Sequence, residues 1–343
     1  MPALLAYTDD ALLASHSGYH VIANYLPDCE KVVTPRREPV SWGGRFKSKV
    51  LRRLAFSRWC VGGSFEMEAQ ISARIAAGYV GCVHYLWCDR DMAFLDRRIN
   101  PSSHPLIGTF HQCADILPDV IRRVSSLRKF AAIIIMSETQ RRWFEERGVS
   151  ASRIHRMLHG VDVDYFHPGA SPNDEEFRVL AVGGTRRNFD LLRSVAASLK
   201  DEPGIKFEVV GPTDRKAMFG GMNNLVYHDR LSDADLLSKY QSASCLLHLI
   251  EDSTANNVVN EAMACGAAVI SERHGGVPEY VSDECALLCS PGSGDEVVKA
   301  IKKLAGDAGR LTEMREAARE HALTLDWRHS AAQLEQLYAG LSA

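Results

Sequence analysis

The sequence has no long apolar run, no recognisable export signal and no C-x-x-C cysteine pair. A membrane-spanning helix needs roughly 18 consecutive apolar residues, whereas the best candidate, residues 131–136, has only the length of a strand. The first ten residues, MPALLAYTDD, lack a basic region and reach two aspartates too early for a secretory signal peptide. None of the nine cysteines falls in a C-x-x-C pair, so we expect reduced thiols in a cytoplasmic protein, without a disulfide scaffold or structural zinc.

Signatures of four enzyme classes are also absent. A nicotinamide-binding domain would show G-x-G-x-x-G directly after a strand, but Gly62-Gly63 and Gly183-Gly184 lack that spacing. The sequence contains no G-x-x-x-x-G-K-[ST], H-E-x-x-H or G-x-S-x-G motif either. The sequence therefore does not support its assignment as a dehydrogenase, a P-loop nucleotidase, a zinc protease or an α/β-hydrolase.

What is present is the composition of a globular protein, with 46% hydrophobic and 24% charged residues over 343 positions. This length suits two domains better than one. The net charge of −3 argues against general nucleic-acid binding, but it hides an asymmetry. Residues 1–167 carry 22 basic and 17 acidic side chains, and residues 168–343 carry 18 and 26. The two halves are therefore expected to face different partners.

Short apolar runs alternate with longer amphipathic stretches through the chain, which predicts an α/β fold with parallel sheets. Residues 168–176, PGASPNDEE, have the composition of a linker. We therefore expect an N-terminal domain over 1–167, a linker over 168–177, a C-terminal domain over 178–325 and a terminal helix over 326–343. The expected strands are 2–7, 80–86, 106–110 and 131–136 in the first domain, and 178–182, 207–210, 225–227, 245–250 and 268–270 in the second.

Residues 260–281, NEAMACGAAVISERHGGVPEYV, resemble the E-A-M-A-C-G … G-G-x-x-E signature of family 4 glycosyltransferases. Further similar segments follow in the family's order, at 107–112, 154–168 and 178–192. The resemblance covers most of the chain and is strongest from about 105 to 330. It implies the GT-B fold, in which two Rossmann-like domains face a cleft and a final helix, here from Trp327, returns to the first domain. It also implies a retaining enzyme that uses a nucleotide-sugar donor.

The turn after the strand 246–250 is a candidate diphosphate site. A strand-to-helix turn directs backbone N–H groups and the positive helix end at an anion, and the side chains of Thr254, Asn256 and Asn257 add polar groups. Glu261 follows within two helical turns and could accept two ribose hydroxyls. The resemblance makes Glu261 the second glutamate of the family's Glu-x7-Glu pair, which holds the ribose.

The first member of that pair is replaced by Ser253. In the family this glutamate contacts donor-sugar hydroxyls, so Ser253 and its neighbour Asp252 are the candidates for binding the donor sugar. A serine can still donate or accept one hydrogen bond. The replacement also leaves open a relative that has lost transfer activity.

Other donor contacts come from the resemblance. Arg187 is the expected diphosphate clamp, because a guanidinium is always charged and can bind phosphate bidentately. Arg186 is either a second clamp or a solvated loop charge, and Gly18 occupies the place of the family's glycine-rich loop. Base recognition is expected at Gly211, Arg230 and Leu231, largely through backbone. The turn of Gly275, Gly276 and Glu279 is expected to border the donor pocket.

His111 ends the predicted strand 106–110 and is the candidate catalytic residue, since the corresponding family histidine approaches the donor sugar. His84, at the end of another strand, is a weaker candidate. No pair of carboxylates suggests a hydrolase, which agrees with the front-face mechanism usually proposed for retaining GT-B enzymes. Asp89-Arg90-Asp91 and Asp162-Val163-Asp164 fit a metal-binding D-x-D only by letters. We therefore expect no metal and no cofactor besides the nucleotide-sugar co-substrate.

The surplus positive charge lies mostly in residues 36–59, which hold eight basic side chains against one glutamate. Phe46, Val50 and Leu54 recur at four-residue spacing, with Trp42 and Trp59 nearby. Such a segment either lies on an anionic membrane surface, at the inner face of the cell membrane, or is a solvated helix over the first domain.

The sequence therefore predicts a retaining, metal-independent hexosyltransferase that acts on a glycan or lipid-linked acceptor in cell-surface polysaccharide or glycoconjugate synthesis. The alternatives are a catalytically silent GT-B relative that acts as a binding subunit, and a GT-B epimerase or phosphorylase.

Overall fold

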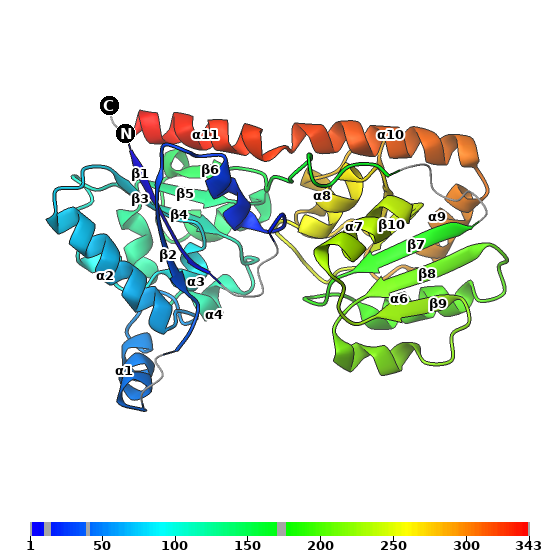
Figure 1. The fold of residues 1–343 in the computed structure, drawn as a ribbon, viewed down its shortest axis with the longest axis horizontal. Helices are drawn as coiled ribbons and strands as arrows, with labels where there is room; N and C mark the ends of the chain where they lie inside the picture. Colours follow the sequence, from blue (N-terminus) through cyan, green and yellow to red (C-terminus); the bar gives the residue numbers. More distant parts are fainter. Residues whose placement is uncertain (1, 10–14, 39–41, 170–175, 342–343) are drawn as a thin grey trace. The chain divides into compact units, whose positions relative to one another are not determined.

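Two parallel six-stranded sheets, each with its own helices, make up the computed structural model of the chain (Figure 1). The structure describes residues 2–9, 15–38, 42–169 and 176–341. One compact unit comprises residues 1–159 and 327–343, and the other comprises residues 160–326. This confirms the predicted α/β class with two Rossmann-like sheets.

The first unit has the strand order β2-β1-β3-β4-β5-β6. Every neighbouring pair is parallel. Central strands such as β5, with the sequence AIII, are buried along their whole length, as expected for a sheet covered on both faces. The strands are β1 (Ala3–Asp9), β2 (Glu30–Pro35), β3 (Cys82–Tyr85), β4 (Leu106–Phe110), β5 (Ala132–Ile135) and β6 (Ile154–Arg156). The helices are α1 (Trp42–Arg52), α2 (Gly62–Ala76), α3 (Cys88–Asp91), α4 (Leu117–Val120), α5 (Arg141–Glu145) and α11 (Trp327–Gly340).

The second unit has the strand order β12-β11-β10-β7-β8-β9, again entirely parallel. Its core gathers apolar side chains of the central strands and of α6 and α9. The strands are β7 (Phe177–Val182), β8 (Ile205–Val210), β9 (Leu225–His228), β10 (Cys245–His248), β11 (Ala268–Glu272) and β12 (Ala286–Cys289). The helices are α6 (Phe189–Ser198), α7 (Asp233–Ser242), α8 (Asn257–Ala264), α9 (Gly294–Ala305) and α10 (Ala308–Thr324).

The last helix, α11, belongs to the first unit although it follows the second in sequence. The buried Trp327 ring packs against Tyr19, with ring centroids 5.6 Å apart, and Ser330 Oγ donates to Leu158 O over 3.1 Å. Tyr338 near its end contacts the buried His84. The boundary between the units falls between His159 and Gly160, eight residues before the predicted end of the first domain. Residues 170–175 of the predicted linker lie outside the described residues.

Each sheet has one point where the strand order reverses. In the first unit it lies between β1 and β3, and in the second between β7 and β10. Ligands of open α/β sheets bind outside the carboxyl ends of the strands at such a point. The loops that follow these four strands are therefore where a site is expected. None of the described helices has the length and apolar character needed to cross a membrane.

Candidate functional site

Two loops meet at the carboxyl ends of β7 and β10. Asn188 N donates to Leu249 O over 3.1 Å, and Glu251 N donates to Arg186 O over 2.9 Å. Arg186 has a φ of 55°, in the left-handed region that a residue with a side chain rarely occupies. Backbone strain of this kind persists where surrounding contacts enforce it, and it concentrates at ligand sites.

Arg187 belongs to the first of these loops, which connects β7 to α6. Its Nε donates to Val182 O over 2.9 Å, and its Nη2 donates to Asn256 Oδ1 over 3.2 Å. Burial lowers the pKa of Arg187 to about 10, so the guanidinium stays charged at neutral pH. No carboxylate of the described residues forms an ion pair with it. A half-buried positive charge bonded to neutral groups, beside the start of a helix, is suited to an anionic ligand.

The helix beside it, α8, begins after Asn256, which is its N-cap residue. Thr254 is buried and Asn257 is half-buried at the start of this helix. The predicted diphosphate contacts therefore gather at one helix N-terminus, together with Arg187.

Glu261 lies on the next turns of α8 and is 4% exposed. Its Oε2 accepts a hydrogen bond from the Tyr240 hydroxyl over 2.8 Å. Burial and the neighbouring Glu261 hold the pKa of Tyr240 well above its usual value, so the hydroxyl remains a donor. Tyr240, on α7, orients the predicted ribose-binding carboxylate, and nothing in the sequence distinguished it from a core aromatic.

Ser253 is 7% exposed, and its Oγ has no hydrogen-bond partner among the described residues. The loop that carries it is held by the glycine turn after β11, because Gly276 N donates to Ser253 O over 2.7 Å. A Cβ atom at Gly275 would stand 2.3 Å from Asp252 Oδ1 and 2.4 Å from Ser253 O. The two glycines thus allow the close approach that fixes the residue 252–253 segment.

Two further residues near the carboxyl ends of the second sheet's strands were not predicted from the sequence. The Nδ1 atom of His274, which precedes the glycine turn, is buried with no partner among the described residues. The carboxylate of Glu272 is buried, and it accepts from Ile250 N over 2.7 Å and from Gly292 N over 2.6 Å. Glu272 therefore ties the loops after β10 and β12 together.

His111 follows β4 in the first unit, as predicted. Its Nε2 lies 2.7 Å from Leu86 O, and its ring packs against Tyr19 and Trp87 with centroid distances of 4.9 and 5.5 Å. Burial lowers the pKa of His111 to about 3, so the ring is neutral at physiological pH. Its backbone N–H donates to Asp89 Oδ2 over 2.7 Å.

The second histidine candidate, His84, has a structural role. His84 is fully buried, and its two ring nitrogens lie 2.6 Å from Tyr338 Oη and 2.8 Å from Thr109 Oγ1. Both nitrogens are thereby occupied in fastening α11 to the sheet.

Comparisons with known proteins relate the second unit to a family and the whole chain to a fold. The family described as "Glycosyl transferases group 1" matches residues 176–307. A solved structure of Anabaena Alr3699/HepE in complex with UDP and glucose has the same fold, with a TM-score of 0.71 at 15% identity over 99% of this chain and 100% of that chain. The chain therefore has the GT-B fold, and its residues 176–307 are similar to a glycosyltransferase family.

Two curated relatives are similar in sequence to this GT-B chain. The sulfoquinovosyl transferase SQD2 of Arabidopsis thaliana is 28% identical over 197 residues, which are 52% of this chain and 38% of SQD2. The MMP alpha-(1->4)-mannosyltransferase of Mycolicibacterium hassiacum is 26% identical over 251 residues, or 68% of this chain and 58% of that protein. The chain thus spans between about a third and three fifths of the length of these two relatives.

The remaining predicted contacts of the GT-B chain lie at the same sheet edges. Gly211 follows β8, and its N–H donates to His228 O over 3.0 Å. The exposed Arg230 and half-buried Leu231 follow β9. In the first unit, Gly18 precedes a short 3-10 helix with a φ of 101°, where a Cβ atom would meet the His20 ring at 3.1 Å.

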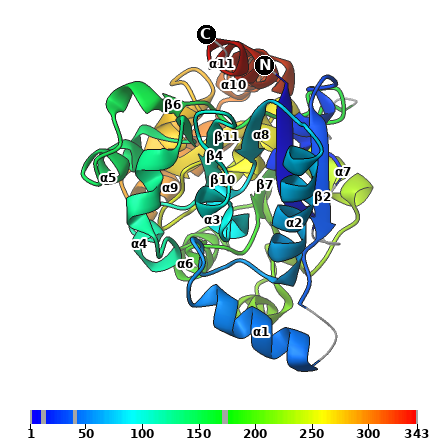
Figure 2. The same ribbon diagram turned by 90° about the vertical axis from the view of Figure 1, so that its left-hand side faces the viewer.

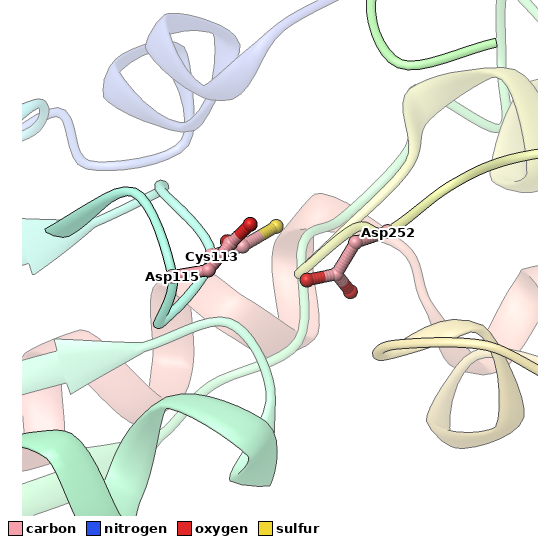
Figure 3. A group of neighbouring side chains, drawn as sticks. All are labelled: Cys113, Asp115 and Asp252. Atoms are coloured by element: carbon pink, nitrogen blue, oxygen red, sulfur yellow. The ribbon is translucent and has the colours of Figure 1, made fainter.

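Figure 3 draws Cys113 and Asp115, which follow β4 in the first unit, and Asp252, which follows β10 in the second. Thiol and carboxylate groups can bind metal ions. Because these residues belong to different units, no metal site is assigned to them.

The basic segment of residues 36–59 forms α1 in part, and α1 lies at the lower end of the first unit, away from the strands (Figures 1 and 2). Residues 39–41 and the side chains of Trp42, Arg45 and Lys47 lie outside the described residues. Lys49 and Arg53 are exposed. The large apolar side chains exposed here are Phe46 at 61%, Val50 at 43%, Leu54 at 59% and Trp59 at 41%.

Proposed function

We propose that the chain is a retaining glycosyltransferase that moves a hexose-type sugar from a nucleotide-sugar to a glycan or lipid-linked acceptor. We assign this role to cell-surface polysaccharide or glycoconjugate synthesis. The observation that carries the proposal is Arg187, a half-buried guanidinium without an acidic partner among the described residues, bonded to the N-cap of α8 at the strand-order reversal. Neighbours of the same fold solved with UDP and glucose support a nucleotide-sugar as the donor.

In this proposal the donor diphosphate lies against Arg187 and the first turn of α8, where Thr254, Asn256 and Asn257 add polar contacts. Glu261, oriented by Tyr240, accepts the ribose hydroxyls. As the bond between the sugar C1 and the phosphate oxygen breaks, negative charge grows on the diphosphate, and Arg187 and the helix end stabilise it. Arg186 supplies backbone geometry to the same loop and is a second candidate clamp.

The transfer follows the front-face route. The acceptor hydroxyl oxygen forms its bond to C1 on the face from which the diphosphate leaves, and the departing phosphate oxygen takes the hydroxyl proton. The protein then contributes position and charge stabilisation, with His111 as the catalytic residue nearest the sugar and without a protein nucleophile. The nucleotide base is assigned to Gly211, Arg230 and Leu231, and the glycine-rich position near the phosphates to Gly18.

The donor sugar is assigned to Ser253 and Asp252. A buried hydroxyl without a partner among the described residues is costly unless a ligand or water satisfies it. The same serine, in place of the family's glutamate, favours the alternative of a catalytically silent binding subunit. An epimerase or phosphorylase remains the alternative within enzymes.

One experiment separates most of these functions. The protein is incubated with a panel of nucleotide-sugars, and both thermal stabilisation and release of nucleoside diphosphate are measured. Stabilisation by one donor with slow nucleotide release supports the transferase, and stabilisation without release under any acceptor supports the silent subunit. Dependence on free phosphate with no nucleotide preference indicates a phosphorylase, and stabilisation by no donor or nucleotide refutes the proposal.

The proposal includes no metal and no further cofactor, because the positive charge at the diphosphate comes from Arg187 and the end of α8. It also places the protein at the inner face of the cell membrane as a peripheral protein. The exposed Phe46, Val50 and Leu54 alternate with exposed basic groups on the α1 segment, which suits an anionic lipid surface.

A further inference from the structure

Asp89 is a fully buried carboxylate in the first unit, on the short helix α3 directly after β3. Its Oδ2 accepts two backbone N–H groups, from His111 over 2.7 Å and from Gln112 over 2.8 Å. Ser57 Oγ donates to the backbone oxygen of Asp89 over 2.6 Å, which fixes the carboxylate's own chain. Asp89 thus joins the segment after β3 to the segment after β4.

The ring of His111 is fastened to the same segment. Because a carbonyl oxygen can only accept, the 2.7 Å contact between Nε2 and Leu86 O requires a proton on Nε2. The neutral ring then carries its lone pair on Nδ1. Backbone and side chain of His111 are therefore both held by residues 86–89, and the tautomer is set.

Burial of the Asp89 carboxylate costs more free energy than a purely structural contact requires. Its Oδ1 is buried with no hydrogen-bond partner among the described residues, so half of its acceptor capacity is unused. An uncharged side chain would avoid the desolvation of a charge, but it would hold the two backbone N–H groups by weaker bonds. A costly buried charge beside a candidate catalytic residue indicates a functional reason for its retention.

We propose that Asp89 is a positioning residue for His111, which it holds at the carboxyl end of β4 while Leu86 O keeps the ring a neutral Nε2–H imidazole. The inference rests on the proposed glycosyl transfer and adds a residue that positions its candidate catalytic histidine.

The surroundings of Asp89 determine its titration. Burial raises the pKa of Asp89 to about 6, while the two N–H groups and Arg90 lower it and Asp91 raises it. Cys88 and His111 are also neighbours of Asp89, and burial keeps both neutral. It raises the pKa of the Cys88 thiol and lowers the pKa of the His111 ring. Protonation of Asp89 below about pH 6 weakens its hold on the two N–H groups, so turnover is expected to fall there.

The first test measures the state of the His111 ring in the wild-type protein. In the intact protein labelled with 15N-histidine, the His111 ring nitrogens are assigned by the loss of their signals in His111→Asn. The proposal expects a neutral Nε2–H tautomer at pH 7 and no protonation down to pH 5. An Nδ1–H tautomer, or a charged ring at pH 7, overturns it.

The second test compares Asp89→Asn with a matched control, Asp119→Asn, whose carboxylate is exposed on α4. We expect Asp89→Asn to lower kcat by about tenfold or more, as expected for weakened charge-assisted bonds, to shift the His111 ring signals, and to remove the loss of activity near pH 6. Affinity for the nucleoside diphosphate should remain, since that site belongs to the second unit. Unchanged kcat, pH profile and ring signals in a folded Asp89→Asn protein overturn the proposal.

The two proposals fail in different ways. If the wild-type protein binds no nucleoside diphosphate, the proposed function is wrong, whatever the state of His111. If it binds nucleotide and turns over donor while Asp89→Asn behaves as wild type, only the positioning role is wrong. Should Asp89→Asn not fold, as judged by thermal unfolding, the wild-type pH profile decides, because a turnover that does not fall below about pH 6 overturns the positioning role.

Discussion

Arg187 donates a hydrogen bond from Nη2 to Asn256 Oδ1 over 3.2 Å, across 69 positions of sequence. This contact links the loop after β7 to the N-cap of α8, and it fixes the charged group at the strand-order reversal of the second sheet. Its main consequence is electrostatic, because the guanidinium is desolvated without an acidic partner among the described residues.

Replacing Arg187 by alanine should remove most of the charge stabilisation of the leaving diphosphate. We expect kcat/KM to fall by about 100-fold or more, the usual loss for one donor to a developing anion. Arg187→Lys should recover part of the activity, since a lysine retains the charge but not the fork of donors. Arg193→Ala, an exposed arginine on α6, is the matched control. Activity equal to wild type in Arg187→Ala would falsify the clamp.

Tyr240→Phe should weaken nucleotide binding without touching the ligand directly. The substitution removes the hydroxyl that donates to Glu261 Oε2 and leaves the carboxylate less well oriented. We expect about a tenfold loss of affinity for the nucleoside diphosphate in calorimetry, typical of a lost hydrogen bond to a charged group. Glu261→Gln should lose at least as much. The control, Tyr338→Phe, removes a buried tyrosine hydroxyl of the other unit and should leave nucleotide affinity unchanged.

The sequence predicted most strands and the position of the candidate site, but it did not predict most contacts between the side chains of that site. Periodicity located the central strands because they are apolar throughout, whereas the edge strands β2, β6 and β12 were not predicted. The glycine turn at 275–276 and Glu261 followed from the resemblance. Tyr240, His274 and Asp89 did not, because their roles depend on which crossovers bring neighbouring strand ends together. His84 shows the converse, since only its contacts with Tyr338 and Thr109 distinguish a structural histidine from a catalytic one.

Stability of the first unit should depend on pH through His84. Burial lowers the pKa of His84 to about 3, whereas an unfolded histidine titrates near 6.5. Between these values the unfolded chain binds a proton that the folded chain does not, so stability decreases as pH falls, by up to about 1.4 kcal/mol per pH unit. His84→Gln removes this dependence. Its stability deficit relative to wild type should therefore shrink between pH 7 and pH 5 in denaturant unfolding, and a constant deficit would contradict the assignment.

Metal removal should leave transfer intact, because the proposal assigns the diphosphate charge to Arg187 and α8. We expect equal rates of nucleotide release in excess EDTA and in magnesium. Complete loss in EDTA with recovery on added magnesium would show that a cation shares the diphosphate, and the metal-independent mechanism would then be wrong.

Binding to anionic lipid vesicles should depend on both the apolar and the basic side chains of α1 and of the residues that follow it. The exposed Phe46 and Leu54 supply apolar area, and the exposed Lys49 and Arg53 supply charge. Each basic group near such a surface contributes about 1 kcal/mol, so Lys49→Gln with Arg53→Gln should weaken sedimentation with phosphatidylserine vesicles by about 30-fold. Phe46→Ser with Leu54→Ser should weaken it at high salt as well, because apolar burial is not screened. Val80→Ser, at a valine that is 68% exposed outside the segment, is the control. If the wild-type protein fails to sediment with these vesicles even at low salt, α1 is a solvated helix and the membrane proposal is wrong.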